Sequence, residues 1–322
     1  MRKLIISSLV LLSGLASCQQ KQSSGTTIKN QVKMDQKMLD IHKQVKTYDY
    51  NPLYEVEFSQ DACGYEILIN GVPLHRYLLL GSTNEQRIPI NDHILTSGKQ
   101  EIIIRLFPPQ LSDQSWSQTL VDASKFKIKV IHHASDNPTE NYKQVFEFIS
   151  SNKPGTENFL ASGQKVFEFK GSFDAEVPYQ LEGWRNSKDL SKEDQDKLLK
   201  EAVAAYNNFR NVLIKKDVNA YASLMYDKEV ELAKAFYWNT PSDSKKRWDE
   251  MSGTVREKRE ILPLKDFKMV LYAGGKVLAL QPTNEMYKDY LSAIQAQTED
   301  NDIQVSFLLH KKADSNELTP IR

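Results

Sequence analysis

The chain has few cysteines, no net charge and, beyond its first residues, no long hydrophobic run. It contains two cysteines, and 42 basic residues balance 42 acidic ones among 322 residues. Two cysteines exclude a metal site built on several thiolates, and a balanced charge without basic clusters argues against nucleic-acid binding. No stretch after residue 18 is apolar and long enough to span a bilayer. We therefore expect no nucleic-acid partner and no cofactor.

Sequence motifs for catalysis are also missing. There is no nucleophile elbow, phosphate loop or pair of histidines at helical spacing. His132 and His133 are neighbours on an expected strand, so their side chains point to opposite faces. Glu55 and Glu57 share one face of another strand at a spacing seen in glycosidases, but apolar neighbours mark the opposite face as buried, which places both acids in water with ordinary acidity. We expect a non-enzymatic protein.

The most informative pattern lies at the N-terminus. Two basic residues open the chain, an apolar run covers residues 4–15, and Ala16 and Ser17 stand directly before Cys18. This arrangement resembles the signal peptide of a bacterial lipoprotein, with the lipobox at residues 15–18. The resemblance implies that signal peptidase II cuts before Cys18, which carries a diacylglyceryl group and is then acylated. Such a lipid group anchors a protein stably in a membrane; the alternative is an ordinary secretory peptide with a chance cysteine.

Neighbouring residues refine this prediction. Gln19, rather than Asp, follows the lipidated position, and by the rule for enteric lipoproteins this favours the outer membrane over the inner one. Once Cys18 is lipidated, Cys63 is the only free thiol. Its neighbours Ala62 and Gly64 indicate a small buried or turn residue, with an exposed reactive thiol as the alternative.

Hydrophobic periodicity divides the rest of the chain. We predict a signal peptide at 1–17, a polar tether at 18–47 with a short helix at its end, a β-sandwich at 48–185 and an α+β domain at 186–322. The fold class is therefore a mainly β, antiparallel N-terminal sandwich followed by an α+β C-terminal domain. Alternating runs of the first half occur at 54–58, 65–70, 87–91, 100–107, 126–131, 145–149 and 165–169.

The period becomes helical after Trp184. Helices are expected from Ser191, which forms a capping-box-like start with Asp194, from Asp217, from about Lys228 and from Thr240 and Pro241. Strands then return at 267–272, 276–280 and 303–310.

A long helix with two aromatic residues, followed by a second helix and a sheet, resembles the NTF2-like superfamily over residues 191–322. It differs from that pattern in an expected helical insertion at 286–297 and in lacking an evident acid-base pair.

Large aromatic residues give the remaining functional hints. Trp116 lies in a long polar connection where no periodic core explains it, so we expect it to contact a partner, with packing as the alternative. Tyr237 and Trp238 end a helix before a proline and either line a pocket or cap a core. Trp184 is expected to pack between the domains.

These features predict a lipid-anchored binding protein of the cell envelope that recognises a protein or a glycan. Two alternatives stay open. The first is an immunity lipoprotein that neutralises a toxin directed to the periplasm. The second is an envelope hydrolase whose catalytic residues are dispersed along the chain.

Overall fold

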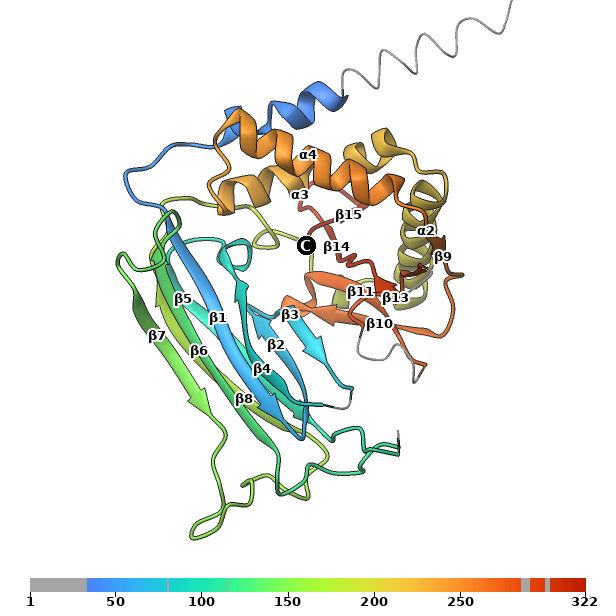
Figure 1. The fold of residues 1–322 in the computed structure, drawn as a ribbon. Helices are drawn as coiled ribbons and strands as arrows, with labels where there is room; N and C mark the ends of the chain where they lie inside the picture. Colours follow the sequence, from blue (N-terminus) through green and yellow to red (C-terminus); the bar gives the residue numbers. More distant parts are fainter. Residues whose placement is uncertain (1–33, 80, 114, 285–289, 299–301) are drawn as a thin grey trace, which may run out of the picture.

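The computed structural model describes residues 34–79, 81–113, 115–284, 290–298 and 302–322. The predicted signal peptide and Cys18 lie outside these residues. A β-sandwich forms one half of the molecule, and a helix-rich half lies against one end of it (Figure 1).

Two four-stranded antiparallel sheets form the sandwich, with strand orders β4-β1-β6-β7 and β3-β2-β5-β8. The predicted antiparallel sandwich is confirmed. The strands are β1 (Pro52–Asp61), β2 (Gly64–Ile69), β3 (Val72–Tyr77), β4 (Thr83–Pro89), β5 (Gly98–Phe107), β6 (Lys125–Ala134), β7 (Lys143–Ile149) and β8 (Phe167–Ala175).

Local sequence explains this arrangement. In β1 the alternate residues Tyr54, Val56 and Phe58 are buried in the core between the sheets, as the period of two predicts. Asn70 and Gly71 both take positive φ, 50° and 75°, and close the tight β2–β3 turn. Strand β4, which ends at Pro89, lies at a sheet edge, where a residue without an N–H is tolerated.

The expectation for Glu55 and Glu57 is wrong. Both are buried, with exposures of 8% and 4%. Glu57 pairs with Lys129 and, at 2.6 Å, with Arg87, while Glu55 contacts Nε2 of His133 at 3.0 Å. Burial by itself raises the pKa of Glu57, but hydrogen bonds from neighbouring side chains, Lys129 and Arg87 among them, outweigh it and lower the pKa to about 2. Long cations from adjacent strands cover these acids, which alternation within β1 does not reveal.

Helices dominate the start of the C-terminal half. Each begins at a side-chain cap: Asp194 for α2 (Gln195–Ile214), Asp217 for α3 (Val218–Ala235) and Thr240 for α4 (Pro241–Arg256). The expected break near Lys228 is absent, since α3 is continuous through it. Between the sandwich and α2, the 3-10 helix η3 (Leu190–Lys192) forms the approach to the first cap; η1 (Ile41–Gln44) and η2 (Asn91–His93) lie earlier in the chain.

Short strands complete this half as two antiparallel sheets, with orders β10-β11-β14-β15 and β13-β12-β9. The structure therefore has the predicted α+β C-terminal part. The helical insertion expected at 286–297 is wrong where it is described, because β12 is a strand; residues 285–289 lie outside the described part. The elements are β9 (Glu260–Ile261), β10 (Phe267–Tyr272), η4 (Ala273–Gly275), β11 (Val277–Pro282), β12 (Gln295–Gln297), β13 (Asp302–Gln304), β14 (Leu309–Lys311) and β15 (Leu318–Pro320).

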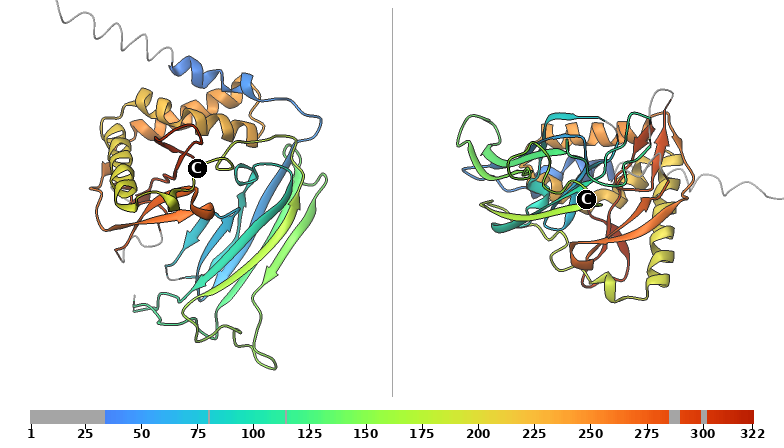
Figure 2. Two further views of the ribbon diagram at one scale, coloured as in Figure 1. Left: turned by 180° about the vertical axis from the view of Figure 1, so that it is seen from behind. Right: turned by 90° about the horizontal axis from the view of Figure 1, so that it is seen from below.

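The end of the predicted tether packs onto the helices. Residues 34–39 are helical, and Met34, Met38, Ile41 and Val45 are buried in the same core cluster as α2, α3 and α4. Figure 2 shows this segment running along the helical side of the molecule. The expected short helix is confirmed, and from residue 34 onward the chain is part of the body rather than a free tether.

A shared core joins the two halves. Trp184 is buried in the same cluster as the sandwich interior, which confirms its expected interdomain packing. The guanidinium of Arg322 lies 5.5 Å from the Trp184 ring centroid and donates to Glu231 at 2.9 Å and to the carbonyl of Asp92 at 2.8 Å. Cys63 is buried, as expected, and burial raises the pKa of its thiol to about 12. These contacts hold the segments that line the pockets described below.

Candidate functional site

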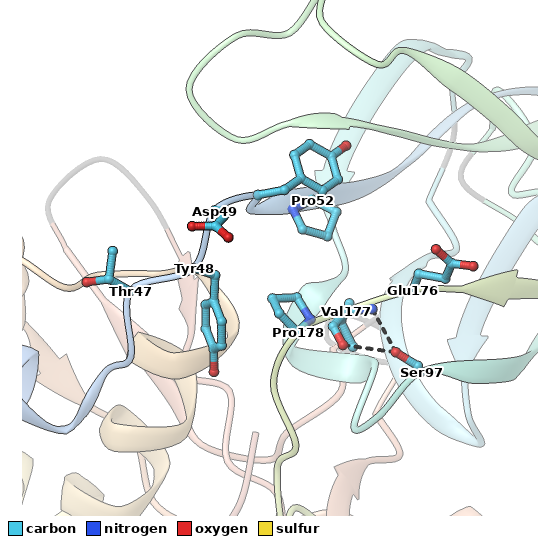
Figure 3. A pocket seen from close by; sticks show the side chains of 9 residues that line it. Thr47, Tyr48, Asp49, Pro52, Ser97, Glu176, Val177 and Pro178 are labelled. Carbon is cyan, nitrogen blue, oxygen red and sulfur yellow. Dashed lines mark hydrogen bonds between the residues drawn. The ribbon is translucent and has the colours of Figure 1, made fainter.

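A pocket of about 650 Å³ opens where the segment before β1 passes the end of β8. Tyr48, Asp49 and Tyr50 line one side of it, and Glu176 and Pro178 line the other. Figure 3 shows Tyr48 and Asp49 facing the segment that leaves β8. We call this the acidic junction pocket.

Hydrogen bonds hold the far wall of this pocket in place. The hydroxyl of Tyr54 accepts the N–H of Glu176 at 2.9 Å. The hydroxyl of Ser97 donates to the carbonyl of Val177 and accepts its N–H, both at 2.9 Å (Figure 3). The wall is therefore pre-organised by the sandwich.

Only acids carry charge on the described lining of the pocket. Asp49 and Glu176 have no ion-pair partner among the described residues, and no lysine, arginine or histidine lines the cavity. Burial raises the pKa of Tyr48, and burial together with the nearby Glu140 raises that of Tyr50. Both phenols stay neutral at pH 7, so the pocket offers two aromatic rings, two hydroxyl groups and two carboxylates.

Tyr237 supports this pocket from behind. Its side chain is 6% exposed, and its ring meets Tyr48 edge-on with centroids 6.2 Å apart. Its hydroxyl donates to the carbonyl of Pro52, a lining residue, at 3.0 Å. The structure thus places Tyr237 in the core beneath the lining rather than on the surface.

Trp238 and Trp116 lie elsewhere. Trp238 is half-buried beside Arg247, whose guanidinium is 5.8 Å from its ring centroid and which pairs with the buried Glu229 at 2.6 Å. Trp116 is half-exposed in the loop between β5 and β6, where it forms an isolated bridge with Gln110. The three predicted contact residues are therefore not brought together.

Sequence reasoning missed the residues that line the pocket. Tyr48, Asp49 and Tyr50 form a Tyr-Asp-Tyr run directly before the first strand, which was the available signal. Glu176 had no local signal, because only the fold carries the end of β8 to this run.

Two features bear on catalysis and on membranes. Ser187 Oγ and His310 Nδ1 are 2.7 Å apart, but both residues are buried, and burial lowers the pKa of His310 to about 4. This pair ties the interdomain linker to β14 and offers no access to a substrate. Within the described residues there is no group of three potential metal ligands, and none of the helices is both long and apolar enough to cross a bilayer.

Comparisons with known proteins bring no relative. No protein-family model matches the chain, and neither a curated protein nor a solved structure matches it. We therefore infer the function from the geometry and charge of the pocket.

Proposed function

We propose that the chain is a non-enzymatic, lipid-anchored binding protein of the cell envelope whose acidic junction pocket holds a basic side chain of a partner protein. The observation that carries this proposal is the lining: Tyr48 and Tyr50 beside Asp49 and Glu176, with no cation among them. Aromatic faces and carboxylates both attract cations, and the attraction strengthens when the cation is partly desolvated.

The choice of a protein over a glycan follows from charge. A neutral sugar would stack on the tyrosines without using the charge of the two exposed carboxylates, whereas a lysine or arginine is attracted both by the rings and by the carboxylates. An open pocket of about 650 Å³ also has room for more than one side chain of a basic segment.

The membrane part of the proposal depends on Cys18 and Gln19, which support lipidation and an outer-membrane location. Mass spectrometry of the mature N-terminus should find cleavage before Cys18 and an acylated cysteine. A Cys18→Ala protein that still sediments with membranes would contradict the anchor.

The pocket is tested with an oligolysine peptide of defined length and the double variant Asp49→Asn/Glu176→Gln. Removing two carboxylates should weaken binding by roughly 10-fold, since an exposed ion pair contributes up to about 1 kcal/mol and a tenfold change corresponds to about 1.4 kcal/mol. The matched control is Glu157→Gln/Asp196→Asn, which removes the same charge from exposed positions outside the pocket lining, in the loop between β7 and β8 and in the first turn of α2.

Two results would contradict the proposal. One is equal binding by the two double variants, because the attraction would then come from net charge alone. The other is a partner from envelope extracts that soluble saccharides release and moderate salt does not, which would make the ligand a glycan.

A further inference from the structure

A second pocket, of about 390 Å³, borders the same loop as the first. Ser97 lines the acidic junction pocket, whereas Thr96 and Lys99 line the second. Its other walls come from Trp184 and Arg185 in the linker and from the β10–β11 turn. Both halves of the molecule therefore contribute to it.

Two tight turns meet at this pocket. The N–H of Ala273 donates to the carbonyl of Gly71 at 2.9 Å. A Cβ on Gly71 would come within 2.9 Å of Cα of Ala273, so only glycine permits this approach. Gly71 and Ala273 are themselves lining residues, and the pocket is thus built on a fixed contact between the halves.

The charge of this pocket is opposite to that of the first. Lys99, Arg185 and Lys276 line it, and Glu101 is the one acid on the described lining. Three cations against one carboxylate leave an excess of two positive charges. We call it the basic junction pocket.

These cations have no carboxylate partner within the described parts of the chain. Lys276 Nζ donates to the carbonyl of Arg185 at 2.5 Å, and Arg185 Nη2 donates to the carbonyls of Leu95 and Leu181 at 3.2 Å each. These hydrogen bonds orient the ammonium of Lys276 and the guanidinium of Arg185, but a carbonyl oxygen carries no full negative charge that would neutralise them. Elsewhere comparable cations are paired: Lys311, for example, contacts two glutamates.

A nearby acid does not neutralise the pocket. Asp189 lies against Gly275, where a Cβ would come within 2.4 Å of its Oδ1. Its carboxylate is already bonded to Ser191 at 2.5 Å and paired with Lys192 at 3.1 Å. Asp189 therefore does not neutralise the excess positive charge of the basic junction pocket.

We propose that the basic junction pocket binds a phosphate group, held by Lys99, Arg185 and Lys276. Phosphate is negatively charged and would balance the excess positive charge of the three cations. Its oxygens accept short, strong hydrogen bonds from ammonium and guanidinium groups. Because Lys99 belongs to the sandwich and Lys276 to the α+β half, the bound anion links the two halves.

The experiment is isothermal titration of the purified protein at low ionic strength with two probes, inorganic phosphate and glycerol phosphate. One site is expected, with Lys99→Gln weakening binding roughly 10-fold, the equivalent of one charge-assisted hydrogen bond. Lys99 makes no ion pair with any residue that the structure describes, so its removal should not unfold the protein. The matched control is Lys200→Gln, an exposed lysine of α2 without an ion pair, which should bind like the unmodified protein.

The two probes separate the sources of the phosphate. Tighter binding of glycerol phosphate indicates a phosphate ester such as a lipid headgroup, and tighter binding of inorganic phosphate indicates a free ion; both support the site. No binding of either probe at millimolar concentration, or equal affinities of the Lys99→Gln and Lys200→Gln variants, would overturn it. A Tyr50→Ala variant should bind phosphate normally, which separates this result from the fate of the acidic junction pocket.

Discussion

The two junction pockets differ in charge although one loop separates them. Asp49 and Glu176 mark the first, and Lys99, Arg185 and Lys276 mark the second. Over the whole chain the charges cancel, with 42 of each sign. The net charge of a chain therefore does not predict the charge of its pockets, because folding can bring acidic residues together in one cavity and basic residues in another.

Among the variants that should affect one pocket and not the other, Tyr237→Ala should have the largest effect. Removing a buried ring should cost about 3 to 5 kcal/mol in the free energy of unfolding, as for other large aromatic residues. The variant should also disturb the lining of the acidic junction pocket, because Tyr237 contacts Tyr48 and Pro52. Chemical denaturation measures the cost.

Tyr237→Phe is the control for this prediction. It keeps the ring and loses only the hydrogen bond to Pro52, so about 1 kcal/mol is expected. A cost of that size for Tyr237→Ala as well would mean that the ring does not support the pocket.

Acid should weaken the contact between the interdomain linker and β14, where His310 bonds to Ser187. Burial lowers the pKa of His310 from 6.5 to about 4, so the unfolded chain binds this proton more readily than the folded one. The contribution of His310 is complete above pH 6.5 and is lost as the pH falls through 6.5 toward 4. It amounts to about 3 kcal/mol at most.

The measurement is the free energy of unfolding against pH for the unmodified protein and for His310→Gln. The variant should show a flatter slope between pH 4 and pH 6.5. Parallel curves would show that the histidine titrates normally in the folded protein.

A charge reversal at Lys99 tests whether the two pockets bind their ligands independently, and it leaves the core unchanged. Lys99→Glu changes the described lining of the basic junction pocket from three cations and one acid to two of each. Phosphate binding should fall roughly 100-fold, because a like charge then faces the anion. Oligolysine binding at the acidic junction pocket should weaken by less than about 3-fold in the same titrations. Equal losses for both ligands would mean that the pockets are not independent.

Trp116→Ala should have the smallest effect on stability. The side chain is half-exposed in the loop between β5 and β6, so less than about 1 kcal/mol is expected. Both pocket ligands should bind unchanged. If Trp116 contacts the partner, binding of the complete partner should weaken by about 2 kcal/mol or more. A stability loss of several kcal/mol would identify it as a core residue.

Much of the fold could be predicted because it depends on neighbours in sequence. Alternation identified the core-facing side of β1, and the caps Asp217 and Thr240 identified the starts of α3 and α4. For α2 the sequence indicated a start at Ser191, whereas the structure places the cap at Asp194. Glu57 shows what neighbours in sequence cannot predict. Its position on the strand was predicted correctly, but its burial depends on Lys129, a residue of another strand.

The candidate site was predicted only in part. The sequence predicts Tyr237 as a contact residue, and the structure places it behind the pocket lining. Tyr48 and Glu176 were missed because more than a hundred positions separate them in the chain, and no local pattern relates them.

By itself the sequence determined the core-facing side of β1, the starts of α3 and α4 and the absence of a cysteine-based framework, since each depends on composition or on residues a few positions apart. Only the tertiary structure decided that Asp49 and Glu176 line one pocket and that Lys99 and Lys276 line another. The physical reason is that the charge of a pocket depends on which distant segments meet there. That meeting is set by the packing of the shared core around Trp184 rather than by any local preference of the chain.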